Sequence, residues 1–150
     1  MTTQDVDFDR SQLGVGYPGG TFVVEKDDIL RYCKATGESD PLCNDEEAAK
    51  AAGHPALLAP PTYCANFVRS LGRPDIKLNF GRIGFHAGES IDIHAPIYAG
   101  DTLTATTGLK DVYTKTGRSG TMVFVVWETS FSNQDGQRVA DVQESHVRRE

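Results

Sequence analysis

The sequence contains few cysteines, no excess of basic residues and no long apolar run. Its 150 residues include three cysteines, and no two of them form a Cys-x-x-Cys pair. An odd number at wide spacing favours free thiols in a reducing cytosol. No apolar run approaches the ~20 residues that a membrane-spanning helix requires. The polar, acidic opening Met-Thr-Thr-Gln-Asp-Val-Asp lacks the apolar segment of a signal peptide. We therefore expect a cytoplasmic protein with no membrane partner.

The shortage of positive charge argues against another class of partner. The chain has 15 Lys and Arg residues against 21 Asp and Glu, which gives a net charge of −6. Nucleic acids and anionic membranes are bound through a basic face, so neither is expected as the main partner. A small anionic ligand held by a few local basic groups remains compatible with this balance. The length suits one compact domain.

Metal and cofactor motifs are also missing. The four histidines are scattered, and none lies three or four residues from another metal-binding side chain on a well-defined helix. The run Gly14-Val-Gly16-Tyr-Pro-Gly19 matches the spelling of a dinucleotide-binding motif. That motif needs a strand before it and a helix after it. Here a polar arm precedes and the β-type run Thr-Phe-Val-Val follows, so we interpret it as a flexible loop. We expect no nicotinamide, flavin or metal.

What is present is a helical first half followed by strands. Residues 1–19 are expected to form a flexible arm, and residues 20–150 one folded domain. A first strand is expected at 21–25, followed by helices at 26–36, 45–52 and 60–71. The third helix begins with Pro60-Pro61, because proline is tolerated in the first turn. Its apolar face makes it the candidate for a buried central helix; that face is formed by Tyr63, Phe67, Val68 and Leu71.

Alternating residues mark the second half as strands. Ile91 and Ile93 alternate with polar residues, and residues 103–109 alternate in the same way. The clearest strand is 121–131, a hairpin turn follows at 133–136, and the last strand covers 138–147. The apolar residues of the clearest strand share one face: Val123, Val125, Trp127 and Phe131. Helices followed by an antiparallel meander predict an α+β fold, with a bent sheet around the central helix.

Residues 36–45 are more informative about function than their composition alone suggests. Residues 36–45, Thr-Gly-Glu-Ser-Asp-Pro-Leu-Cys-Asn-Asp, would otherwise be a helix stop and an acidic turn. They resemble the motif Thr-Gly-Asp-x-Asn-Pro-x-His of the MaoC-like (R)-specific enoyl-thioester hydratases and 3-hydroxyacyl dehydratases, which have the hotdog fold. In that family a small helix, a glycine and an Ala-Pro turn follow, as residues 45–53 and Leu58-Ala-Pro-Pro-Thr62 do here.

A second match lies downstream, in residues 85–101. They read Phe-His-Ala-Gly-Glu-Ser-Ile-Asp-Ile-His-Ala-Pro-Ile-Tyr-Ala-Gly-Asp. This run is similar to the signature of the dehydratase N-terminal branch of the family, in which His-Gly-x-Gln is followed by alternating residues, His-x-Pro-[Leu/Val] and Gly-Asp. The order and spacing of the two matches extend the resemblance over residues 20–147, so it implies a single hotdog domain.

The departure from the family motif matters as much as the match. In active relatives the Asp and His of the motif orient the water that adds to, or leaves, the double bond. Glu38 stands at the aspartate position, Asp40 at the asparagine position and Cys43 at the histidine position. A thiol does not replace an imidazole that titrates near neutral pH. The resemblance therefore implies no catalytic residue in this chain.

The partner implied is a catalytic MaoC-like subunit that supplies the Asp and His, in a heterodimer or a dimer of heterodimers. The implied substrates are acyl thioesters of coenzyme A or acyl carrier protein, in fatty acid or steroid metabolism. Whether the chain is an enzyme in its own right stays open. Within the third helix, the candidate residues either line an acyl tunnel or belong to the core; they are Pro60, Tyr63, Phe67 and Leu71.

Two alternatives remain. The first is a self-sufficient homomeric hydratase that uses Glu38 with an acid such as His86 or His94. The second is a hotdog thioesterase or acyl-thioester binding protein. Hotdog thioesterases of similar layout usually have a carboxylate near the start of the central helix, and the stretch Pro60-Pro-Thr-Tyr-Cys has none.

Overall fold

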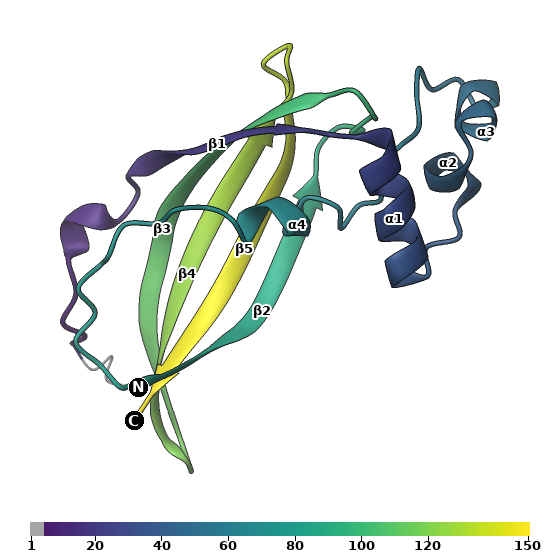
Figure 1. Ribbon diagram of the computed structural model, residues 1–150. Helices are drawn as coiled ribbons and strands as arrows, with labels where there is room; N and C mark the ends of the chain where they lie inside the picture. The colour runs from purple at the N-terminus through teal and green to yellow at the C-terminus, as the bar shows by residue number, and fades with distance from the viewer. Residues whose placement is uncertain (1–4) are drawn as a thin grey trace.

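Five antiparallel strands form one sheet in the computed structural model, which describes residues 5–150 (Figure 1). Neighbouring strands follow the order β1-β3-β4-β5-β2, so β1 and β2 form the two edges. The predicted antiparallel sheet is confirmed. The strands are β1 (Gly16–Val23), β2 (Ile83–Ile93), β3 (Thr102–Gly117), β4 (Gly120–Ser132) and β5 (Arg138–Arg149).

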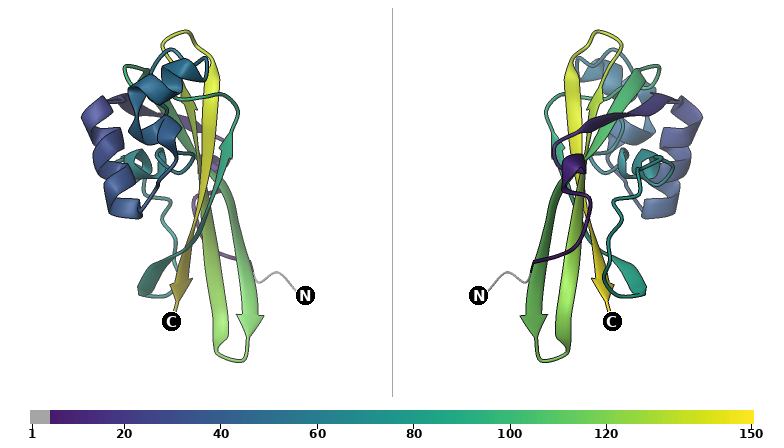
Figure 2. Two further views of the ribbon diagram at one scale, coloured as in Figure 1. Left: turned by 90° about the vertical axis from the view of Figure 1, so that its right-hand side faces the viewer. Right: turned by 90° about the vertical axis from the view of Figure 1, so that its left-hand side faces the viewer.

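The helices all lie on one side of this sheet (Figure 2). We call the face that they cover the inner face, and the opposite face the outer face. The helices are α1 (Lys26–Thr36), α2 (Pro41–Asn44), α3 (Glu46–Ala51) and α4 (Ala65–Val68), and one 3₁₀ turn, η1 (Arg10–Gln12), precedes β1. None of the helices within residues 5–150 is long and apolar enough to cross a membrane.

Local signals explain the first helices. α1 has the predicted bounds, because its chain leaves the helix at Gly37 with φ 74°, a left-handed conformation that glycine adopts easily. α3 begins after Asp45, whose side chain accepts hydrogen bonds from the backbone N–H groups of Glu47 and Ala48. These signals agree with the predicted helices at 26–36 and 45–52.

The predicted central helix at 60–71 is wrong in length. Only α4, residues Ala65–Val68, is α-helical. Before it, the chain makes tight turns such as the bond from Tyr63 N–H to the carbonyl of Pro60, at 2.9 Å. Pro61 disfavours helical backbone at Pro60, the first residue of the predicted helix. After it, the Ser70 hydroxyl donates to the carbonyl of Phe67 at 2.9 Å and competes with helical bonding.

The shortened segment still packs on the inner face. Tyr63, Cys64 and Val68 are buried together with Leu57 and Phe131 of the main core cluster. The four residues predicted to share one face of β4 are indeed buried, with exposed fractions of 0 to 6% for Val123, Val125, Trp127 and Phe131. A second cluster at the other end of this face adds Phe8, Ile76 and Leu109.

The glycine-rich run belongs to a strand, contrary to the predicted loop. β1 begins at Gly16, five residues before the predicted position, and pairs with β3 through a bulge between Pro18 and Gly20. A side chain at Gly19 would lie 3.0 Å from the Cβ of Ala105, so this position needs glycine for close pairing. Of the predicted flexible arm, residues 1–4 lie outside the described part of the chain.

Candidate functional site

Two residues at the motif positions, Glu38 and Asp40, stabilise the loop between α1 and α2. Glu38 follows the end of α1, and its Oε1 accepts a hydrogen bond from the backbone N–H of Asp40 at 3.0 Å. The Asp40 side chain caps α2 by accepting from the N–H of Leu42, also at 3.0 Å. Both carboxylates therefore satisfy backbone donors of the loop between α1 and α2, which is what acidic residues do at helix starts.

Cys43 is part of the core. Its exposed fraction is 4%, and its carbonyl accepts a weak hydrogen bond from the Cys33 thiol at 3.5 Å. Burial, together with the charge of Asp40, raises the pKa of the Cys43 thiol to about 11. The thiol is consequently uncharged at neutral pH. Glu38, Asp40 and Cys43 do not form an acid–base pair.

The predicted acyl-binding residues are divided between the core and a cavity. Tyr63 is 2% exposed and packs edge-on against the rings of Tyr32 and Phe67. The Phe67 ring stacks on Phe22 with 4.6 Å between centroids. Pro60 is also buried, whereas Leu71 lines a cavity beside β2. Their role in binding an acyl chain remains a prediction.

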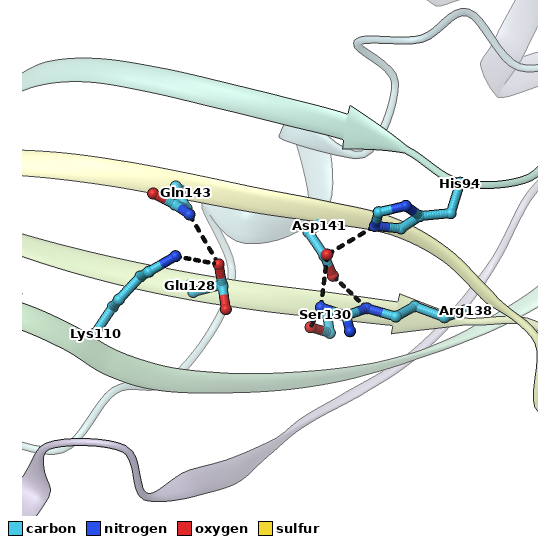
Figure 3. A network of polar contacts seen from close by, with 7 residues as sticks. All are labelled: His94, Lys110, Glu128, Ser130, Arg138, Asp141 and Gln143. Atoms are coloured by element: carbon cyan, nitrogen blue, oxygen red, sulfur yellow. Dashed lines mark hydrogen bonds and ion pairs between the residues drawn. The ribbon is translucent and has the colours of Figure 1, made fainter.

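The two candidate histidines lie on opposite faces of the sheet. His86 stands directly opposite His146 in the pairing of β2 with β5, on the inner face. His94 follows the end of β2, and its Nε2 lies 2.7 Å from Oδ2 of Asp141 on the outer face (Figure 3). Their carboxylate neighbours are Glu144 and Asp141 respectively. Within residues 5–150, no hydrogen bond or ion pair joins Glu38 to either histidine.

Asp141 is the centre of the polar network on the outer face (Figure 3). It is 8% exposed and accepts hydrogen bonds from Nε and Nη2 of Arg138, at 2.8 and 2.6 Å. Burial by itself raises the pKa of Asp141, but hydrogen bonds from His94, Arg138 and Ser130 outweigh it and hold the pKa below its ordinary value. Asp141 is thus a charged carboxylate that orients His94.

A second network on the inner face was not predicted from the sequence. Arg73 donates through Nη2 to the carboxylate of Glu144, whose side chain is 7% exposed, and its guanidinium lies 5.2 Å from the centre of the Trp127 ring. His86 and His146 flank the pair, with Nε2 3.9 and 4.0 Å from Oε1 of Glu144. Burial lowers the pKa of His146 and outweighs the opposite effect of the Glu144 carboxylate, and the charges of Arg73 and His86 lower the pKa further.

One sequence signal for this network exists. Glu144 lies two residues after Val142, and alternate residues of a strand share a face. A carboxylate on the buried face of a strand is unusual and requires a partner. The partner, Arg73, is 71 residues away in the sequence, so the pattern of β5 does not identify it.

Two cavities adjoin this network. One has a volume of about 620 Å³ and the other of about 410 Å³, and both are lined by Arg73, His86 and His146. They lie beside the edge strand β2, which contributes His86 to both and Glu89 to the smaller one. No group of three or more His, Cys, Asp or Glu side chains within residues 5–150 is arranged to hold a metal ion.

Comparisons with known proteins agree with this fold. The family described as "FAS1-like, dehydratase domain region" matches residues 11–142. A UPF0336 protein of Parafrankia sp. (strain EAN1pec) is 32% identical over 125 residues, which covers 80% of each chain.

Solved structures give the same result. A chain of the C-terminally truncated HadBC (3R-hydroxyacyl-ACP dehydratase) complex from Mycobacterium tuberculosis superposes with a TM-score of 0.73 at 22% identity, covering 93% of this chain and 98% of that one. A MaoC-like dehydratase superposes with a TM-score of 0.79 at 20% identity, covering 93% of this chain and 42% of that one. The chain therefore belongs to the FAS1-like dehydratase domain family, and its predicted MaoC-like hotdog fold is confirmed.

Proposed function

We propose that this chain is the non-catalytic subunit of a heteromeric (R)-specific enoyl-thioester hydratase or 3-hydroxyacyl-thioester dehydratase. The observation that carries the proposal is the condition of the three motif positions. Glu38 and Asp40 bind backbone N–H groups of their own loop, and Cys43 is a buried, uncharged thiol. Hydration and dehydration need a group that exchanges protons with water near neutral pH. These residues supply none, so a partner has to supply it.

The edge strand β2 supports pairing with a second hotdog subunit. Within residues 5–150, β2 is hydrogen-bonded to β5 on one side only, and its residues are exposed along most of its length. Three large apolar side chains on it are exposed, namely Ile83 at 50%, Phe85 at 46% and Ile93 at 41%. A long edge with apolar side chains is a liability unless another strand covers it. The structural similarity to a chain of the HadBC complex favours a hotdog partner.

The proposal also assigns a use to the inner face. Both cavities lie beside β2, so a subunit paired along this strand would extend their walls. Ligand sites occur preferentially at such seams. The acyl thioester would then lie between the catalytic residues of the partner and the inner face of this chain.

The test is reconstitution. The gene next to this one is examined for a second small hotdog protein with an intact Asp and His motif, and the two chains are purified separately and together. We expect negligible hydration of enoyl thioesters by this chain alone and turnover by the co-purified complex. Robust turnover by the isolated chain that Glu38→Gln abolishes would support the self-sufficient enzyme instead.

A further inference from the structure

The larger cavity concentrates positive charge in an acidic protein. Its lining residues include Arg73, Arg82 and Arg148, and Asp75 is the one carboxylate among them. Because Arg73 is already paired with Glu144, the uncompensated positive charges are those of Arg82 and Arg148. The whole chain carries a net charge of −6. Positive charges gathered at one place in an acidic protein produce a local positive potential that attracts anions.

Several of these donors have no acceptor. Within residues 5–150, Arg82 and Arg148 form no ion pair, and Asp75 is already paired with Lys77 at 2.8 Å. Nε of Arg73 is buried and has no hydrogen-bond partner in the described chain. An unsatisfied buried donor costs about 1–3 kcal/mol. An anion in the cavity would supply acceptors to Arg82 and Arg148.

The backbone directs one of these arginines across the edge strand. Gly84 of β2 stands directly opposite Arg148 of β5. A Cβ at Gly84 would lie 3.4 Å from Cδ and Nε of Arg148, so the arginine side chain lies over the glycine. This arrangement places the Arg148 guanidinium in the cavity wall, close to the chain position of Arg82.

The rest of the wall is apolar. The inner face of β4 contributes Val125 and Trp127, and the segment that follows α4 contributes Ile76 and Leu78. This segment runs from α4 across the helix-covered side of the sheet before it enters β2 (Figures 1 and 2). The volume of about 620 Å³ is within the range of small-molecule sites. Apolar walls with cations at one side suit a ligand that is itself part apolar and part anionic.

We propose that this cavity binds an organic phosphate, with the phosphate oxygens on Arg82 and Arg148 and the organic part against Trp127. Guanidinium groups match phosphate oxygens in pairs of parallel hydrogen bonds. The binding site stands on the cavity alone. The assignment of its ligand to the phosphate-bearing carrier of an acyl thioester rests on the proposed function.

The test measures binding by the isolated, full-length chain. Isothermal titration calorimetry is run with coenzyme A, which carries a 3′-phosphate and a diphosphate, with 3′-dephospho-coenzyme A, and with pantetheine, which carries no phosphate. Trp127 is the one tryptophan of the chain, so its fluorescence reports whether the ligand occupies this cavity. We expect saturable binding of coenzyme A, a matching fluorescence change, and binding of pantetheine weaker by at least about tenfold.

Matched variants locate the site. Arg82→Gln and Arg148→Gln should each weaken coenzyme A binding by about tenfold or more, because each removes charge-assisted hydrogen bonds. Arg118→Gln, in the turn between β3 and β4, changes the same charge outside the cavity and should leave binding unchanged. Circular dichroism spectra of the variants confirm that each is folded.

The outcomes separate this inference from the proposed function. No binding, equal binding of pantetheine, equal binding of inorganic pyrophosphate, or equal loss in Arg118→Gln would each overturn the organic-phosphate site. An active complex whose chain binds no coenzyme A would leave the subunit proposal intact and end this inference. Binding as expected by a chain that also turns over substrate alone would retain the site and end the subunit proposal.

Discussion

Arg73 and Glu144 form an ion pair that joins the segment after α4 to the last strand of the sheet. The side chains are 17% and 7% exposed, and the Arg73 guanidinium also lies over Trp127. Breaking a buried pair leaves one charge without a partner in a poorly hydrated site. This contact therefore holds the segment that forms one wall of the larger cavity.

Replacing Arg73 should destabilise the chain strongly. Arg73→Ala leaves the Glu144 carboxylate buried and unpaired, and we expect a loss of about 3–5 kcal/mol in the free energy of unfolding. Urea denaturation followed by circular dichroism measures it. Arg31→Ala is the control, because its pair with Asp28 lies at the surface, where ion pairs contribute little. A loss as small as that of the control would show that the inner-face pair does not fix the segment.

The buried thiols should make stability fall at alkaline pH. Burial raises the pKa of Cys43 to about 11 and that of Cys64 to about 12, whereas an unfolded thiol titrates near ~8.5. Above that value the unfolded state releases protons that the folded state retains, so stability decreases as pH rises towards 11. The midpoint of thermal unfolding is measured from pH 8 to about pH 11.

Truncating a buried side chain also changes packing, so the unfolding temperature of a variant at a single pH does not test this prediction. The test is the slope of the unfolding temperature against pH. Cys43→Ala should flatten the alkaline decline of the unfolding temperature relative to the unmodified chain. A decline with the same slope in the variant would mean that the Cys43 thiol is not the group that retains its proton.

Asp141 should contribute stability that is lost in acid. Its hydrogen bonds with His94, Arg138 and Ser130 hold its pKa below the ordinary value despite burial. A depressed pKa stabilises the folded state above the unfolded pKa of about 3.9, and this contribution disappears as pH falls through the folded pKa. Asp141→Asn should lower stability at pH 7 and reduce the decline below pH 4. Asp111→Asn, at an exposed aspartate on β3, is the control and should change neither quantity.

Much of the fold follows from local signals in the sequence. The helix α1 and the strands β4 and β5 have clear periodicity and clear end signals, such as Gly37 and the turn at 133–136, and their positions were predicted within a few residues. The strand β1 was predicted too short, because its glycines form a strand only through pairing with β3. That pairing depends on the tertiary structure and leaves no periodic pattern.

The candidate site was predicted less completely. The motif resemblance drew attention to Glu38, Asp40 and Cys43, and the structure assigns them local hydrogen-bonding and packing roles. The inner-face network escaped prediction because Arg73 lies in an irregular segment, and Glu144 meets it only across the folded sheet. Contacts of this kind are set by the arrangement of elements rather than by neighbouring residues.

The last prediction concerns the motif positions in the reconstituted complex. If the partner supplies the acid and base, Cys43→Ala should lower turnover by less than about tenfold, equivalent to under ~1.4 kcal/mol of barrier. Glu38→Gln should be similarly mild, because within residues 5–150 its side chain accepts one hydrogen bond, from the N–H of Asp40, and the amide oxygen of glutamine accepts the same bond. The matched variant replaces the motif histidine of the catalytic subunit by alanine. It should lower turnover by ~10²–10⁴-fold, the usual contribution of a positioned acid–base group.

Initial rates of enoyl-thioester hydration are compared at equal complex concentration, after gel filtration has shown that each variant still assembles. A loss of ~10²-fold or more in Glu38→Gln with assembly intact would place a working carboxylate in this chain, because neither packing nor capping changes enough in that substitution to slow the partner's chemistry to that extent.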